Sequence, residues 1–319
     1  MNPSKRKSAL IVGCTGQDGV LLSEYLKGLK YDIIGIDRTG VLHSETSLDD
    51  KRLAVFSEDD VQGFIRETRP DEIYYLAAFH HSSEETQPEA IELFSKSHEV
   101  HVAGYLNFLA AIHQTSPETR ILYAASSHIF GSPVTELCSE TTPFNPVSPY
   151  GITKLAGLMT GRFFRRDFGV FASAGILFPH ESSLRKPTFL SRRIVKTAVD
   201  IKRGLQSELK IGNLQASSDW GYAPDYIRAM HGILNAADPD DFVVATGVLH
   251  TVQQFVEITF DSLELDWKRY VIEDETTLVR KSRSFAGNAT KLMERTGWKP
   301  SISFEEMVRL LVREVVHAG

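Results

Sequence analysis

Residues 9–19 read ALIVGCTGQDG, an apolar run that ends in a glycine-rich turn. The apolar start of this run predicts a buried strand, and Val20–Leu29 repeats apolar residues at three- and four-residue spacing, which predicts a helix. Gly13, Gly16 and Gly19 have the spacing that permits a tight turn, close backbone approach to a pyrophosphate, and close packing of helix on strand. The helix N-terminus also favours an anion. This stretch therefore predicts a dinucleotide-binding strand–turn–helix unit.

The same alternation of strand and helix continues along the chain. Strand-like runs occur at Ala9–Val12, Asp32–Ile36, Glu72–Leu76, Arg120–Ala124, Phe171–Leu177 and Phe242–Thr246. Helical patterns include Val20–Leu29, Val61–Thr68, His98–Gln114 and Tyr150–Phe168. Because such alternation places helices on both faces of a parallel sheet, we expect an α/β fold with a Rossmann-like doubly wound parallel sheet.

The pattern changes beyond about residue 178. Residues 179–220 lack regular alternation, and residues 288–316 predict two helices separated by Gly297-Trp298-Lys299-Pro300. We expect residues 1–178 to form the dinucleotide-binding domain and residues 179–319 a smaller C-terminal substrate-binding lobe. A strand near residues 242–247 is expected to return to the first sheet.

Composition excludes several classes of protein. The 319 residues are 42% hydrophobic and 24% charged, which is globular rather than disordered. A net charge of −6, spread along the chain, gives no basic surface for nucleic acid or an anionic membrane. Cys14 and Cys138 are the only cysteines, which suits a reducing compartment and excludes a cysteine zinc site. The apolar run near the N-terminus is too short for a signal peptide or a roughly 20-residue membrane span, so a cytoplasmic protein is expected.

Four histidines stand at or just beyond strand ends, but their spacing fits no metal-ligand set, so no metal site is predicted. They are His80, His81, His128 and His180.

Two residues at the end of the second strand leave the choice between NAD and NADP open. An acid about 20 residues beyond the glycines commonly binds the adenosine ribose 2′-hydroxyl, whereas a base accepts a 2′-phosphate. Asp37 favours NAD and Arg38 favours NADP, and either could be a solvated loop charge. The glycine-rich segment is expected to contact the cofactor through Gly13, Thr15, Gly16, Gln17, Asp18 and Gly19.

A Ser–Tyr–Lys set predicts the chemistry. Tyr150 and Lys154 are four residues apart on a helix entered through Ser148-Pro149, so the ammonium can lower the phenol pKa. Ser126 ends a strand, at the edge of a doubly wound sheet where ligands bind. Ser126 would hydrogen-bond a substrate hydroxyl, Tyr150 would move its proton, and Lys154 would hold the cofactor ribose. The alternative is that Ser126 only ends a strand and that Tyr150 lies on the helix surface.

Together with Leu76-Ala77-Ala78, these residues resemble the extended short-chain dehydrogenase/reductases, the nucleotide-sugar epimerases and dehydratases. Almost end to end, the chain is most similar to the GDP-mannose 4,6-dehydratase family within that group. The strings that carry this resemblance are ALIVGCTGQDG (9–19), TTPFNPVSPYGITK (141–154), LFPHES (177–182), GNLQASSDWGYAPDY (212–226), ATGVLHTVQQF (245–255) and Trp298-Lys299-Pro300.

The resemblance implies two lobes, NADP(H), a GDP-hexose between the lobes, and a homodimer or homotetramer. It places Leu76, Ala77, Ala78, Tyr150, Lys154 and His180 against the cofactor. It places Ser127, His180 and Glu181 near the substrate.

Departures from the family lie where substrate chemistry is expected. The glutamate that removes the C5 proton is replaced by His128, which could act as a neutral base or simply cap a strand end. Pro179 and Ser218 replace polar residues, and residues 279–285 lack the usual Arg-Pro segment. Cations that could hold a diphosphate instead, or lie on a solvated face, are Arg192, Arg193, Arg280 and Arg283.

Three functions remain open on the sequence. The first is an NADP-dependent nucleotide-sugar 4,6-dehydratase in which Tyr150 takes the C4 hydroxyl proton and His128 the C5 proton. The second is a nucleotide-sugar reductase or epimerase, which needs only Ser126, Tyr150 and Lys154. The third is a cofactor-binding homologue that has lost turnover, since fold does not fix function.

Overall fold

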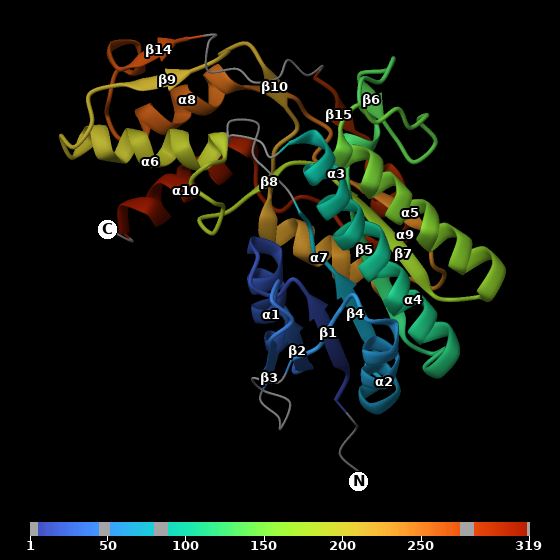
Figure 1. Ribbon diagram of the computed structural model, residues 1–319. Helices are drawn as coiled ribbons and strands as arrows, with labels where there is room; N and C mark the ends of the chain where they lie inside the picture. Colours follow the sequence, from blue (N-terminus) through green and yellow to red (C-terminus); the bar gives the residue numbers. More distant parts are fainter. Residues whose placement is uncertain (1–5, 45–51, 80–88, 275–283, 318–319) are drawn as a thin grey trace.

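The structure is a computed structural model that describes residues 6–44, 52–79, 89–274 and 284–317. The predicted residues His80, His81, Arg280 and Arg283 lie outside these ranges. Figure 1 shows a central sheet with helices on both faces and a second group of helices beyond one end of the strands.

The central sheet has seven strands in the order β12-β7-β5-β4-β1-β2-β3. All neighbours are parallel except the antiparallel edge strand β3. The order reverses between β1 and β4, which is the doubly wound arrangement that the sequence predicts. The strands are β1 (Ser8–Val12), β2 (Asp32–Ile36), β3 (Leu42–Ser44), β4 (Glu72–Tyr75), β5 (Arg120–Ser126), β7 (Ala172–Leu177) and β12 (Asp241–Val244).

Two groups of helices cover the sheet. One face carries α1 (Gln17–Gly28), α7 (Ala223–Leu234) and α9 (Thr290–Thr296), which pack on one another and on β5, β7 and β12. The other face carries α2 (Glu58–Thr68), α3 (Ala90–His98), the π-helical turn η1 (Glu99–Ala103), α4 (Gly104–Thr115) and α5 (Pro149–Phe168).

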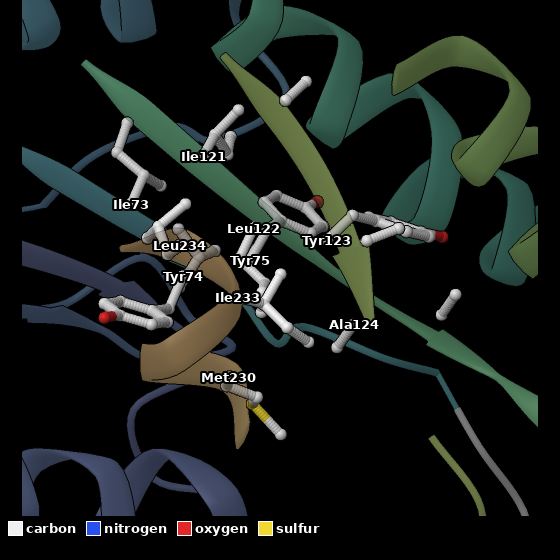
Figure 2. Packing of buried hydrophobic residues seen from close by; sticks show 14 of the residues in the cluster. Ile73, Tyr74, Tyr75, Ile121, Leu122, Tyr123, Ala124, Met230, Ile233 and Leu234 are labelled. Atoms are coloured by element: carbon white, nitrogen blue, oxygen red, sulfur yellow. The ribbon is translucent and has the colours of Figure 1, made fainter. Parts of the chain in front are cut away.

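The buried strands β4 and β5 send alternate side chains to the two helical layers. Tyr75 and Tyr123 are cross-strand partners that stack with ring centroids 6.1 Å apart on the side of α4. Tyr74 points to the opposite face, where Figure 2 places it near Met230 and Leu234 of α7. Burial on both faces explains why these strands read as continuous apolar runs.

Helix α5, which carries two of the predicted catalytic residues, has clear start and stop signals. The Ser148 side chain accepts a hydrogen bond from the Gly151 amide, and Pro149 occupies the first turn. Gly169 ends the helix with φ 67°, a left-handed conformation that glycine adopts easily.

A second hydrophobic core lies beyond the carboxyl ends of the strands. It is formed chiefly by α6 (Leu190–Lys202), α8 (Val252–Asp261) and α10 (Phe304–His317), with the strand pair β9 (Leu209–Ile211) and β14 (Val271–Glu273). Three short pairs connect the irregular segments: β6 (Leu137–Cys138) with β15 (Ala286–Gly287), β8 (His180–Glu181) with β11 (Gly221–Tyr222), and β10 (Ser217–Ser218) with β13 (His250–Thr251). The remaining elements are two 3₁₀ turns, η2 (Ser127–Ile129) and η3 (Trp267–Arg269).

The predicted strands and helices are confirmed, including the return of β12 beside β7 and the two helices at the end of the chain. Helix α6 falls in the stretch for which the sequence indicated no regular alternation. Within the described residues, no helix is long and apolar enough to cross a bilayer.

Candidate active site

The predicted site residues meet at one edge of the sheet. The glycine-rich turn follows β1, β5 ends at Ser126, and β7 is followed by Phe178 and His180. Because these strands are parallel, their carboxyl ends lie together, where ligands bind in open α/β sheets. In Figure 1 this edge faces the second group of helices.

The glycine-rich turn is built for a close approach of the backbone. Gly13 has φ +96°, and a Cβ on it would lie 3.0 Å from the Ala77 nitrogen. A Cβ on Gly19 would lie 2.4 Å from the Gly13 oxygen, so only glycine lets α1 pack this close to β1. Gly16 begins α1 without a side-chain cap, which leaves the first amides of the helix for another acceptor. These residues fit a dinucleotide pyrophosphate.

The segment after β4 lies beside this turn. The Leu76 amide donates to the Val12 carbonyl at 2.9 Å, which extends the ladder between β4 and β1 by one step. Ala77 and Ala78 follow at once, so the structure places all three predicted cofactor residues along the turn. Thr15 is exposed at its tip.

The carboxylate of Asp37 is largely used by its own loop. Its Oδ1 accepts hydrogen bonds from the Thr39 amide at 2.7 Å, the Thr39 hydroxyl at 2.8 Å and the Val41 amide at 3.0 Å. Burial alone would raise the pKa of Asp37, but these hydrogen bonds lower it to about 2. The Arg38 side chain is exposed beside it. A fixed negative charge and an exposed cation therefore stand together where the adenosine ribose is expected.

Ser126, Tyr150 and Lys154 come together as predicted. Ser126 is buried and accepts a hydrogen bond from the His128 amide through its Oγ at 3.3 Å, and its hydroxyl is close enough to Tyr150 to lower the phenol pKa. Lys154 is 1% exposed, and its Nζ donates to the Ala124 carbonyl at 2.8 Å. Its Nζ lies 5.8 Å from the centroid of the Tyr150 ring.

The electrostatics of this group differ from the expectation. Burial raises the pKa of Tyr150 to about 12, and the groups that lower it in part are the Ser126 hydroxyl and the charge of Arg185. Burial lowers the pKa of Lys154 to about 7, although the Asp18 charge raises it in part. Arg185 is thus a cation that lowers the phenol pKa in part, while burial lowers the pKa of Lys154 itself. A buried ammonium is costly, so Lys154 is favoured as a proton-exchanging group.

Two imidazoles pack against the Tyr150 ring. The His128 ring, the exposed side chain of the otherwise buried turn η2, is nearly perpendicular to it at 84° with centroids 5.4 Å apart. The His101 ring, from η1, is perpendicular at 86° with centroids 5.2 Å apart. His128 was predicted from the sequence, whereas His101 was not.

His180 joins the glycine-rich turn to β8. Its Nε2 lies 3.1 Å from each carboxylate oxygen of Asp18, and its Nδ1 donates to the Phe178 carbonyl at 2.7 Å. Nearby, Ser182 donates to the Gln17 side chain at 2.9 Å. His180 therefore lies on the cofactor side of the site, in contact with two residues of the predicted cofactor loop.

The predicted substrate residues have different surroundings. Ser127 is buried at the start of η2. Glu181 is buried and accepts the Ser191 hydroxyl, and the Arg185 Nε lies 3.5 Å from it, so this carboxylate holds the start of α6. Arg193 donates to the Lys210 carbonyl at 3.0 Å.

Arg192 precedes Arg193 on α6. Its Nη1 is buried without a hydrogen-bond partner among the described residues, and burial lowers the pKa of the guanidinium. A buried guanidinium nitrogen of this kind is suited to an anionic oxygen.

The sequence did not assign Arg185 or Thr153 to the site. Arg185 stacks on Phe189 at 3.8 Å from the ring centroid, and Thr153 hydrogen-bonds His101. Arg185 stood in a visible cationic cluster, but no spacing signal linked it to Tyr150. No cluster of three metal-ligating side chains occurs in the part of the chain that the structure covers.

Comparison with known proteins gives one family. The family model described as GDP-mannose 4,6 dehydratase matches residues 10–311. The chain is 38% identical to GDP-mannose 4,6 dehydratase 2 of Arabidopsis thaliana over 97% of this chain and 87% of that one. It is 33% identical to the GDP-mannose 4,6 dehydratase of Homo sapiens over 98% of this chain and 91% of that one.

Solved structures share the fold at lower identity. RMD from Pseudomonas aeruginosa complexed with NADPH has a TM-score of 0.81 at 19% identity, covering 98% of this chain and 100% of that one. The UDP-glucose 4-epimerase of Thermotoga maritima with UDP-glucose has a TM-score of 0.81 at 20% identity, covering 98% of this chain and 99% of that one.

Proposed function

The chain belongs to the GDP-mannose 4,6-dehydratase family, and we propose that it removes water from a GDP-linked hexose such as GDP-mannose. The product is the 4-keto-6-deoxy sugar nucleotide. The cofactor is a nicotinamide dinucleotide, NADP or NAD, which is regenerated in each turnover.

One observation carries this proposal: Tyr150 lies close enough to the Ser126 hydroxyl, at the carboxyl end of β5, for that hydroxyl to lower the phenol pKa, and this is the same edge as the uncapped start of α1. A dinucleotide whose pyrophosphate lies on α1 would extend its nicotinamide toward this phenol. When bound, the dinucleotide supplies the redox chemistry, accepting hydride from C4 of the sugar and returning it to C6.

In the first step, Tyr150 accepts the proton of the C4 hydroxyl, and Ser126 holds that hydroxyl in place. The uncharged form of Tyr150 dominates at neutral pH because its pKa is about 12, so proton transfer from the sugar needs an onward acceptor. Lys154, with a pKa lowered to about 7, is suited to pass that proton on or to hold the ribose as a cation.

The second step needs a base at C5, and His128 is the proposed group. Its imidazole is exposed at the site edge and packs on Tyr150. The C4 ketone acidifies the C5 proton, which a neutral imidazole can remove. The imidazolium so formed can donate its proton to the departing C6 hydroxyl, which leaves as water.

A reductase or epimerase is the second candidate, because the base position carries His128 rather than a carboxylate. Redox at C4 alone needs only Ser126, Tyr150 and Lys154. Incubation with GDP-mannose and a catalytic amount of NADP or NAD separates the two. A 4-keto-6-deoxy product without net cofactor change supports dehydration. Inversion at C4 in this incubation supports the second candidate, and so does the stoichiometric oxidation of added NAD(P)H when a 4-keto sugar nucleotide is supplied as substrate. Inertness with cofactor bound supports a homologue without turnover.

We also propose that the second group of elements, α6, α8 and α10 with β9 and β14, binds the nucleotide part of the substrate. The support is Arg192, whose buried Nη1 is suited to a diphosphate oxygen. Arg192→Gln should raise the KM for the sugar nucleotide by about 10-fold with kcat retained, because the contact is the same in the ground and transition states.

A homodimer or homotetramer is a further part of the proposal. The neighbouring helices α4 and α5 expose large apolar side chains, a feature of association surfaces. They are Leu106, Ile152, Met159 and Phe163. Light scattering of the wild type and of Met159→Glu tests the assembly, and a monomeric wild type would contradict it.

A cytoplasmic location is proposed on the two cysteines. Cys14 and Cys138 are both buried free thiols, which suits a reducing compartment. Fractionation of the expressing cells tests this location.

A further inference from the structure

His101 is a buried histidine that the proposed chemistry does not use. It lies in η1, the π-helical turn between α3 and α4, with 0% of its surface exposed. Isolated π-helical turns commonly occur at functional positions. Its ring meets the Tyr150 ring nearly at a right angle, with centroids 5.2 Å apart.

Two hydrogen bonds fix the orientation and tautomer of the His101 ring. The Phe79 amide donates to Nε2 at 3.0 Å, so Nε2 carries no hydrogen. Nδ1 therefore carries the hydrogen and donates to the Thr153 hydroxyl at 2.8 Å. That hydroxyl in turn donates to the Pro149 carbonyl at 2.9 Å. A second proton, on Nε2, would place one N–H group against another, because the Phe79 amide is also a donor. This arrangement therefore favours the neutral imidazole.

The backbone of η1 holds the ring close to α5. The Tyr123 hydroxyl donates to the His101 carbonyl at 3.1 Å. A Cβ on Gly157 would lie 2.5 Å from the same carbonyl oxygen, so α5 and η1 are in direct contact there. These contacts hold the backbone of His101 against α5.

The partners of His101 connect two parts of the site. Phe79 is two residues beyond Ala77, which lies against Gly13 of the cofactor turn. Thr153 lies on α5, one helical turn from Tyr150. A single ring thus links the backbone that lines the cofactor turn to the helix that carries the phenol.

We propose that His101 is a positioning residue that fixes the Tyr150 phenol relative to the cofactor turn, through its hydrogen bonds to Phe79 and Thr153. This inference rests on the proposed function, in which the phenol exchanges a proton with the C4 hydroxyl. Proton and hydride must leave the same carbon, so the phenol and the cofactor must be aligned together. A displacement of about 1 Å in such a geometry can lower the rate by about 100-fold.

The test separates hydrogen bonding from packing. His101→Phe retains an aromatic ring against Tyr150 and removes both hydrogen bonds. Thr153→Val keeps the imidazole and its bond to Phe79, and it removes the Nδ1 partner together with that hydroxyl's own bonds to the Pro149 and Tyr150 carbonyls. The matched control is His113→Phe, the same change at an exposed position of α4. With turnover normalised to bound cofactor, we expect kcat to fall about 30- to 100-fold in His101→Phe and about 5- to 10-fold in Thr153→Val. The KM should stay within about 2-fold, and the kcat–pH profile should shift. His113→Phe should match the wild type.

A second readout does not depend on activity. The Tyr150 ring is labelled with ¹³C at Cζ and assigned by comparison with Tyr150→Phe. His101→Phe and Thr153→Val should move its resonance and its titration midpoint, and His113→Phe should not. If the wild type converts no sugar nucleotide while the resonance moves, the proposed function fails and the positioning role stands. The positioning role is overturned if folded His101→Phe or Thr153→Val keeps the wild-type kcat, pH profile and resonance. If His101→Phe does not fold, the same measurements on Thr153→Val decide.

Discussion

His180 and Asp18 form a buried ion pair between β8 and the first turn of α1, with Nε2 3.1 Å from both carboxylate oxygens. Burial alone would lower the pKa of His180, but the Asp18 charge and hydrogen bond raise it above its usual value. Burial alone would raise the pKa of Asp18, and the His180 charge lowers it to about 2. The pair places a carboxylate paired with an imidazole in the first turn of α1, beside the amides that no side chain caps.

The ion pair should stabilise the fold in a defined pH range. Asp18, with a lowered pKa, contributes above about pH 4 and loses its contribution as the pH falls toward 2. His180, with a raised pKa, contributes fully below about pH 6.5 and loses its contribution as the pH rises through its folded pKa. His180→Gln should therefore lower the free energy of unfolding by about 2 kcal/mol at pH 5.5 and by less at pH 9. Urea unfolding at both pH values measures this, with exposed His113→Gln as the control. An equal loss at both pH values would refute the ion pair.

Lys154 should cost stability at neutral pH. Its folded pKa of about 7 lies below its unfolded value, so between about pH 7 and 10.5 the unfolded chain binds more protons and stability rises with pH. Lys154→Met removes the buried charge and should unfold at higher urea than the cofactor-free wild type at pH 6.5, by roughly 2 kcal/mol. The difference should shrink at pH 9.5, while turnover falls at least about 100-fold. Lys299→Met, at an exposed position beyond α9, is the control. A less stable Lys154→Met at pH 6.5 would contradict the cost of the buried ammonium.

The fold and much of the site followed from local signals. Glycine spacing after β1 and the strand–helix alternation predicted the doubly wound sheet, because both depend on contacts between residues close in sequence. Ser126, Tyr150 and Lys154 were found because strand ends and a four-residue helical spacing place them at one edge.

The rest depends on tertiary contacts that leave no periodic signal. In the sequence, nothing distinguishes His101 from the rest of an amphipathic stretch. Only the packing of η1 on α5 brings its ring to Tyr150. Arg185 stands in a loop 35 residues beyond Tyr150 in sequence, and its charge offsets part of the rise that burial causes in the Tyr150 pKa. The sequence predicted that Lys154 would do this, but it could not show how strongly burial lowers the pKa of the lysine itself.

Asp37 and Arg38 should set the preference between NAD and NADP. The Asp37 charge persists across the working pH range because its pKa is about 2, and it repels a 2′-phosphate. Asp37→Asn keeps an oxygen for the Thr39 and Val41 hydrogen bonds and removes the charge. The ratio of NADP to NAD affinity should therefore rise about 10-fold, and it should fall about 10-fold in Arg38→Ala. Fluorescence titration of both cofactors measures the ratio. Asp32→Asn, an exposed carboxylate at the other end of β2, is the control, and an unchanged ratio in both test variants would exclude these residues from selection.

His128 should be needed for water loss but not for cofactor binding. Its exposed imidazole packs on Tyr150, so His128→Ala removes a solvent-facing side chain without opening the core. Loss of a general base should lower the rate of dehydration by about 10²- to 10⁴-fold, while the Kd for NADP or NAD stays within about 2-fold. His128→Glu restores a proton acceptor at the same position and should recover at least about a tenth of the activity, whereas His128→Gln should not. Turnover of GDP-mannose in D₂O reports the step directly, because removal and return of the C5 proton place deuterium at C5 of the product. If His128→Ala still dehydrates at the wild-type rate with deuterium at C5, another group removes that proton, and the exposed imidazole is only a packing partner of Tyr150.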